Sequence, residues 1–274
     1  MAERPPLIIT ATPNICWLQR DVPYPDTAEA MADEARRCED AGAAILHMHA
    51  DDWPPMIRAV RAHTSLIVQC GMSSRTPAER MDVFEQRGDM ISIITSHHDE
   101  AFAGLDVHVL HPREELLEYA RLQAEWGVRL EYEIWHTGSI WNLEWLIEHA
   151  QLEPPYFTSL FFGWPGGSWS PPTVEEYAYR RRHLPAGSVA TVSIMDPRQI
   201  DIVTAAIEAG DHVRVGTEDY PFDSDGQQAE THVLVAEVAE LARGLGRAIA
   251  TTEEARALTG VPFGDHAPVA GRSE

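Results

Sequence analysis

Lysine is absent from this 274-residue chain, so all 21 basic side chains are arginine. This absence excludes enzymes that form a Schiff base between lysine and a carbonyl substrate or pyridoxal phosphate. It also excludes a P-loop nucleotide site, because that motif contains a lysine. Activation of a carbonyl group by this protein would therefore need a metal ion.

Cysteine and long apolar runs are also scarce. Cys16, Cys38 and Cys70 are an odd number of cysteines at wide spacing, which fits neither a disulfide framework nor a cysteine-based zinc site. No run approaches the roughly 18 apolar residues of a membrane span, and the first residues lack the basic and apolar regions of a signal peptide. We expect reduced thiols and a soluble, cytoplasmic protein.

The 21 basic residues are outnumbered by 43 acidic residues, which gives the chain a formal net charge of −22. A surface of this sign repels phosphate groups, so nucleic acids and anionic membranes are excluded as partners. An anionic substrate would have to meet a local cluster of arginines.

Short β-rich apolar runs alternate with helical patterns along the whole chain, which predicts βα units and a parallel sheet. Eight strands are expected, at residues 7–12, 44–49, 66–70, 90–94, 129–135, 156–162, 188–194 and 212–216. Helices are expected at 26–41, 114–126 and 229–245, the first opening with a capping-box spacing at Asp26 and ending at Gly42. The prediction is a single (β/α)8 TIM barrel domain over residues 1–274, with 264–274 a flexible tail and 101–112 unassigned.

His47 and His49 alternate along the second expected strand, which puts both imidazoles on one face. Glu218 follows the eighth strand, which lies two places from the second in a closed barrel, and barrel active sites form at these strand ends. Two imidazoles and one carboxylate suit a catalytic Zn²⁺ with an open fourth position. The alternative is that both histidines are hydrogen-bonded residues of the core.

Other polar residues fall at the same end of the predicted barrel. Arg214 would hold Asp219 ionised and oriented, as a general base requires, or the two would form a structural ion pair. Glu131 and Glu133 share one face of the fifth strand, and burying two carboxylates is costly unless they bind something. Weaker candidates are Gly166 in the glycine-rich segment after the sixth strand and the loop histidines His97, His98 and His136.

With these residues in place, the chain resembles the beta-keto acid cleavage enzyme family, whose best-known activity is 3-keto-5-aminohexanoate cleavage. The resemblance covers nearly the whole chain, and its motifs occur in the family's order: residues 8–11, 41–49, 131–133, 163–167, 213–219 and 250–256. It implies a zinc-dependent barrel that converts a β-keto acid and acetyl-CoA into acetoacetate and a new acyl-CoA. It also implies a homotetramer.

The resemblance assigns roles to individual positions. His47, His49 and Glu218 match the family's metal ligands, Asp219 its general base and Arg214 the residue that orients the base. Glu133 and Ser92 match polar residues that line the substrate site.

The chain departs from the family around the substrate. Trp17 stands where the best-known member has a glutamate for the substrate's amino group, with Asn14 and Cys16 nearby, and the loop that begins Cys70-Gly71 differs from the usual Ser-Thr-Gly-Gly type. We therefore expect Trp17, Asn14 and Gly71 to contact the substrate. Trp17, Trp135, Trp164 and Trp169 suggest a larger or more apolar substrate tail, or a cation on a ring face.

Two other functions fit part of the pattern. A zinc-dependent barrel hydrolase of the amidohydrolase type also uses a His-x-His pair, but its bridging lysine is impossible here. A non-catalytic protein in which the metal only stabilises the barrel mouth is the alternative from a different class.

Overall fold

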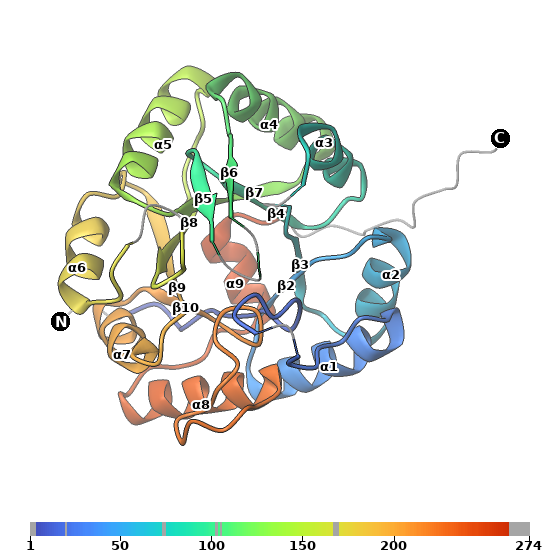
Figure 1. Ribbon diagram of the computed structural model, residues 1–274, viewed down its shortest axis with the longest axis vertical. Helices are drawn as coiled ribbons and strands as arrows, with labels where there is room; N and C mark the ends of the chain where they lie inside the picture. The colour runs from blue at the N-terminus through green and yellow to red at the C-terminus, as the bar shows by residue number, and fades with distance from the viewer. Residues whose placement is uncertain are drawn as a thin grey trace.

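The computed structural model describes residues 4–19, 21–72, 75–101, 104, 106–166 and 170–262. Eight parallel strands form a closed barrel in the order β1-β10-β9-β8-β7-β4-β3-β2, with helices on the outside (Figure 1). The strands are β1 (Ile9–Ala11), β2 (Ile45–Met48), β3 (Ile67–Cys70), β4 (Met90–Ile94), β7 (Arg129–Ile134), β8 (Tyr156–Phe162), β9 (Ser188–Ile194) and β10 (His212–Val215). The predicted barrel is confirmed, and each strand lies within two residues of its predicted ends.

Nine helices are found in the described part of the chain. They are α1 (Ala28–Ala41), α2 (Trp53–His63), α3 (Pro77–Glu85), α4 (Arg113–Trp126), α5 (Thr137–Ala150), α6 (Val174–Arg182), α7 (Gln199–Ala209), α8 (Thr231–Gly244) and α9 (Thr252–Thr259). Gly42 ends α1 in the left-handed conformation, as predicted. The predicted cap at Asp26 is wrong by one residue, because the side chain of Thr27 accepts the hydrogen bond from the Ala30 amide.

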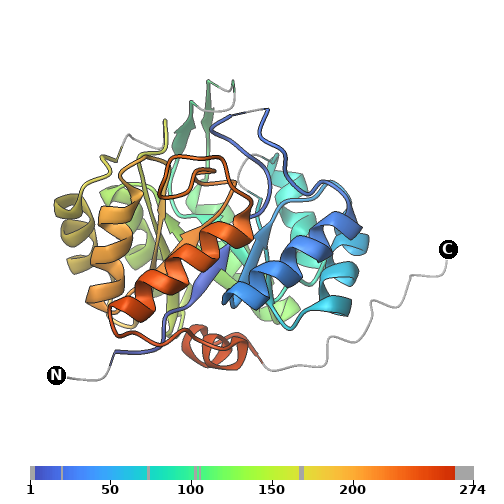
Figure 2. The same ribbon diagram turned by 90° about the horizontal axis from the view of Figure 1, so that it is seen from below.

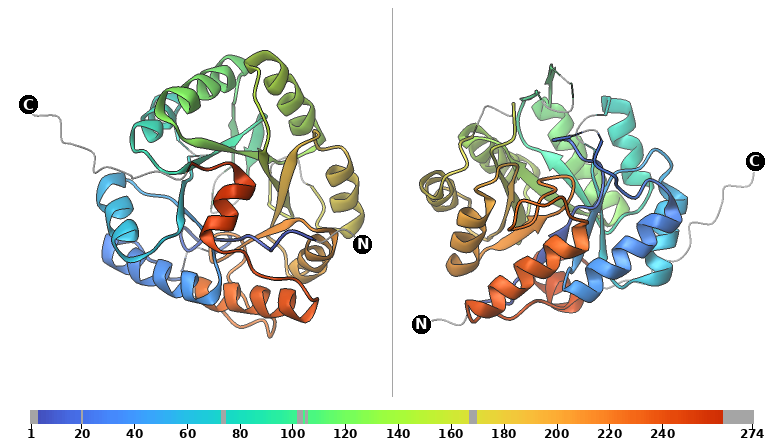
Figure 3. Two further views of the ribbon diagram at one scale, coloured as in Figure 1. Left: turned by 180° about the vertical axis from the view of Figure 1, so that it is seen from behind. Right: turned by 60° about the horizontal axis from the view of Figure 1, so that its bottom comes forward.

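One end of the barrel is closed by α9, which lies across it (Figure 3). Ala255 and Val261 pack there with the first inward-facing residues of the strands, among them Ile8, Ile45 and Phe157. Because this end is apolar and sealed, the polar inward-facing residues lie farther along the strands, toward their C-terminal ends.

The opposite end carries a short antiparallel hairpin, β5 (His98–Glu100) and β6 (Val107–Val109), which stands above the barrel (Figure 2). Sequence reasoning left residues 101–112 unassigned, and half of this hairpin is formed by them. A further antiparallel bridge joins Glu100 to Gly166 in the loop after β8. The hairpin is therefore tied to the mouth of the barrel.

Some expectations fall on residues that the structure does not describe. The predicted tail at 264–274 and Trp169 lie outside the described residues. Within them, no helix is both long and apolar enough to cross a membrane.

Candidate active site

The three predicted metal ligands meet inside the barrel. His47 and His49 come from β2, Glu218 follows β10, and only β1 stands between these strands. The Nε2 atoms of the two histidines are 3.2 Å apart, and Oε1 of Glu218 lies 3.5 Å from His47 Nε2 and 3.3 Å from His49 Nε2. All three side chains are buried.

This arrangement fits a tetrahedral zinc ion. With zinc–ligand bonds of about 2.0 to 2.2 Å, the ligand atoms of a tetrahedron are roughly 3.3 to 3.6 Å apart. The three observed separations fall in or next to that range. Oε2 of Glu218 is buried without a hydrogen-bond partner, and such an atom calls for an explanation such as a bound ion.

Each imidazole is held by the protein around it. Nδ1 of His47 lies 2.7 Å from Oε1 of the Gln69 side chain, so Nδ1 carries the proton and Nε2 is free for a metal. The Asn14 side chain donates to the His49 carbonyl and accepts from the His49 amide. Gln69 and Asn14 thus set the orientation of the ligands.

Gly71 leaves the space that the imidazoles occupy. A Cβ atom at this position would lie 2.4 Å from Cε1 of His49 and 2.8 Å from Nε2 of His47. The absence of a side chain is therefore a packing requirement of the ligand pair.

Arg214 connects Glu218 with Asp219. Its Nη2 donates to Glu218 at 2.7 Å, and its Nε and Nη2 donate to Asp219 at 3.0 to 3.2 Å. Burial raises the pKa of Glu218, but the guanidinium and the two imidazoles outweigh it and hold that pKa well below its usual range. Burial raises the pKa of Asp219 to about 6 against the opposing effect of Arg214. A carboxylate with a pKa near neutral is suited to accept a proton.

With this geometry in view, the comparison with known families is decisive: a model of beta-keto acid cleavage enzymes matches residues 6–261. The chain belongs to this family.

Relatives in the family act on different keto acids. The chain is 28% identical to the 3-keto-5-aminohexanoate cleavage enzyme of Acetoanaerobium sticklandii, covering 93% of this chain and 98% of that protein. It is 25% identical to the 3,5-dioxohexanoate:acetyl-CoA acetone transferase of Paraburkholderia graminis, covering 94% and 96%. The solved structure "Binary complex of ObcA with oxaloacetate" has the same fold, with a TM-score of 0.71 at 17% identity over 88% of this chain and 68% of that one.

The remaining polar candidates lie on the strands that surround the same interior of the barrel. Ser92 and Glu131 are register partners on β4 and β7, and both are buried. Glu131 accepts a hydrogen bond from Ser159, and burial raises its pKa to about 8. Glu133 accepts from the Trp135 indole at 2.9 Å, and burial raises its pKa too. Both carboxylates are buried, and both are close enough to Arg214 for its guanidinium to lower their pKa values against the larger effect of burial.

Two predicted substrate contacts have other partners in the structure. The amide of Asn14 is engaged with the backbone of His49, as described above. The glycine conformation of Gly166 (φ 92°) allows close approach to the backbone of Asp99 on β5, so the close contact is with protein. Trp17 does lie beside the site, with its ring edge-on to His49 at 6.0 Å.

Among the loop histidines, His136 caps α5 by accepting from the Gly138 amide, and His97 accepts from the His111 amide. His98 is buried against Glu100. Sequence reasoning missed Gln69 and Glu100. Gln69 occupies the inward-facing position two residues before Gly71, so strand alternation could have found it, whereas Glu100 lies on a strand that was not predicted.

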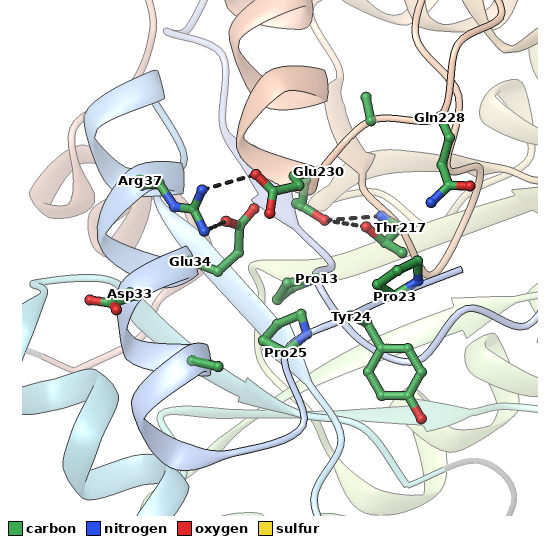
Figure 4. Close-up of a pocket in the computed structure, with 13 residues that line it drawn as sticks. Pro13, Pro23, Tyr24, Pro25, Asp33, Glu34, Arg37, Thr217, Gln228 and Glu230 are labelled. Atoms are coloured by element: carbon green, nitrogen blue, oxygen red, sulfur yellow. Dashed lines mark hydrogen bonds and ion pairs between the residues drawn. The ribbon is translucent and has the colours of Figure 1, made fainter. Parts of the chain in front are cut away.

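Two clefts open near these residues. One of about 560 Å³ is lined by His49, Trp17, Asn14 and Arg75, so it leads from the exterior to a predicted metal ligand. The other, of about 440 Å³, lies where α1 meets the start of α8 (Figure 4). There Arg37 bridges Glu34 and Glu230 at 3.0 and 2.9 Å, which satisfies both carboxylates without a metal ion.

Proposed function

We propose that this enzyme transfers the acyl part of a β-keto acid to CoA, using acetyl-CoA as co-substrate and releasing acetoacetate. The carrying observation is the geometry of the site: three ligand atoms 3.2 to 3.5 Å apart beside an arginine-held aspartate. Membership of the family and the acetyl-CoA named for a relative support the same reaction.

His47, His49 and Glu218 would hold Zn²⁺, which supplies Lewis-acid stabilisation of negative charge on the keto oxygen. Asp219 would remove the proton from the carbon between the ketone and the carboxylate. Arg214 would keep Asp219 directed at that carbon. The Nη1 atom of Arg214 is buried and has no hydrogen-bond partner among the described residues, so it can donate to an anionic substrate.

The bond changes balance without any further reactant. The carbanion attacks the carbonyl carbon of acetyl-CoA, and the CoA thiolate leaves. This thiolate then attacks the keto carbon of the original β-keto acid. The bond between that keto carbon and the carbon that lost the proton breaks, which gives the new acyl-CoA. The proton held by Asp219 returns to the departing acetoacetate. No lysine is needed at any step, which agrees with the composition.

A mass-spectrometric screen tests this proposal. Protein supplied with zinc is incubated with acetyl-CoA and a panel of β-keto acids that differ in the charge and bulk of their tails. A new acyl-CoA together with acetoacetate supports the proposal and identifies the substrate class. Zinc-loaded protein that forms no product with any acid overturns it. If that inactive protein has a lower melting temperature after zinc is removed with a chelator, the site is a structural metal centre.

The family resemblance also leads us to propose a homotetramer. Light scattering on the purified chain gives its mass in solution, and a monomeric mass would contradict this proposal.

A further inference from the structure

The β5–β6 hairpin presents one face to the barrel and the other to solvent. His98 and Glu100 alternate along β5 and are both buried, whereas Asp99 between them pairs with His108 on the outer face. The bridge from Glu100 to Gly166 fixes the inner face over the ends of the strands, at the end of the barrel opposite α9 (Figure 2). His98 therefore faces the mouth of the active site.

The contacts of His98 place it next to the substrate residues. Its ring lies 4.8 Å from the ring of Trp135 on one side and 5.4 Å from that of His111 on the other. Trp135 directly follows β7, two residues beyond Glu133, and its indole donates a hydrogen bond to the Glu133 carboxylate. His98 also lies close enough to Glu133 for the two side chains to interact electrostatically.

Hydrogen bonding accounts for only one nitrogen of this imidazole. Nε2 lies 3.2 Å from Oε1 of Glu100, so it donates to that carboxylate. Nδ1 is buried and has no hydrogen-bond partner among the described residues. In a neutral imidazole whose Nε2 carries the proton, Nδ1 is an acceptor, so the missing partner is a hydrogen-bond donor. Buried polar atoms are rarely left unpaired, which points to a bound molecule.

The electrostatic surroundings narrow the identity of that molecule. Glu100 and Glu133 flank His98, and Glu131 lies one inward position below Glu133 on the same strand. An anionic group has no proton to donate to Nδ1 and would meet the Glu100 carboxylate in this corner, whereas a hydroxyl or an amino group has the proton that Nδ1 needs.

We propose that His98 is a specificity-determining residue of the substrate site and that it binds a hydroxyl or amino group on the tail of the β-keto acid. This inference rests on the proposed function, because it names the tail of that reaction's substrate. The donor group of the tail would complete the hydrogen bonding of a histidine whose ring faces and second nitrogen are already engaged.

The test compares three β-keto acids of equal chain length whose tails end in a hydroxyl, an amino group or a methyl group. We expect kcat/KM of the native enzyme to be at least about 10²-fold higher for a donor-bearing tail than for the methyl tail, because an unpaired buried polar group penalises the analogue. His98→Phe fills the same space without an acceptor, so it should abolish this preference. His98→Asn returns an acceptor oxygen near the Nδ1 position and should restore part of it.

His108→Asn is the matched control, because His108 is on the outer face of the same hairpin with an 86% exposed side chain. It should keep the full preference, and melting temperatures of all three variants show whether they fold. The role of His98 is overturned if the native enzyme forms acyl-CoA equally well from donor-bearing and methyl tails, or if His98→Phe keeps the native preference. Either result leaves the proposed reaction standing. Absence of acyl-CoA from every substrate overturns the proposed reaction, and this inference with it.

Discussion

Glu218 and Asp219 are adjacent in the chain, yet their contacts differ and fit the different roles that we propose for them. Oε1 of Glu218 faces the two imidazoles, whereas both oxygens of Asp219 face Arg214. Replacing each carboxylate in turn by the amide of the same shape can therefore distinguish the effect of the metal ligand from the effect of the general base.

Asp219→Asn should keep zinc and lose turnover. The amide cannot accept a proton, and loss of a general base typically costs about 10²- to 10⁴-fold in rate. Zinc content by elemental analysis and kcat with acetyl-CoA are measured on the same sample. Near-normal turnover of this variant would contradict the base assignment.

Glu218→Gln should instead weaken zinc binding, because a neutral amide replaces the anionic ligand. We expect the affinity to fall by more than the roughly 10- to 100-fold typical of lost hydrogen bonds to metal ligands. Competition with a chromophoric chelator measures this affinity, with Asp219→Asn as the control of matched charge. Equal affinities of the two variants would show that Glu218 is not a ligand.

Gly71→Ala should also reduce zinc affinity, although glycine offers no ligand atom. The new methyl group would lie 2.4 Å from the His49 ring, so one imidazole must move away. Gly244→Ala is the control, because a Cβ there meets nothing within 4 Å and its φ is ordinary for a helix. If zinc affinity were the same in both variants, the space beside the imidazoles would not matter for the metal.

At the scale of elements, the strands that carry the site were predictable and the short hairpin was not. The barrel strands are rich in apolar residues because both their faces are buried. β5 (His-Asp-Glu) has no apolar residue, and β6 (Val-His-Val) is only three residues long and largely exposed, so the longer buried apolar runs that mark the barrel strands are missing here. The roles of Asn14 and Gly166 escaped prediction for a related reason, since both depend on segments that only the tertiary fold brings together.

The start of α8 supports the turn that carries Glu218 and Asp219. The hydroxyl of Thr231, the first residue of α8, accepts from the Thr217 amide at 3.0 Å and contacts the Thr217 hydroxyl at 2.9 Å. The Thr12 carbonyl at the end of β1 accepts from the Glu218 amide at 3.0 Å. Figure 4 shows the bonds at Thr217 on the wall of the cleft between α1 and α8.

Thr231→Val should therefore weaken zinc binding and lower kcat, because it removes the hydroxyl while keeping the shape of the side chain. Thr231→Ser keeps the hydroxyl and should restore both quantities. Zinc affinity and kcat are measured beside the melting temperature. A Val variant that is less stable but has native zinc affinity and kcat would limit Thr231 to a structural role.

At the scale of the whole molecule, the ring closes where β1 meets β10, and a buried histidine sits at that seam. Nδ1 of His212 accepts from the Ile8 amide at 3.0 Å. Burial, with a contribution from the Arg247 guanidinium, lowers the pKa of His212 to about 3. The folded protein thus holds this imidazole neutral at pH values where the unfolded chain protonates it.

Because of this residue, the free energy of unfolding should decrease as the pH is lowered. An unfolded histidine has a pKa of about 6.5, so between about 6.5 and 3 the unfolded state binds a proton that the folded state does not. The slope of the unfolding free energy approaches about 1.4 kcal/mol per pH unit.

The substitution His212→Asn tests this effect, because the new side chain can still accept a hydrogen bond from the Ile8 amide but cannot be protonated. We expect His212→Asn to be less stable than the native protein at pH 7.5 and the difference in unfolding free energy to shrink by about 1 kcal/mol at pH 5.5. Urea unfolding at both pH values, with metal removed from both proteins, measures this change, and a difference that stays constant with pH would show that His212 is not held neutral at the seam.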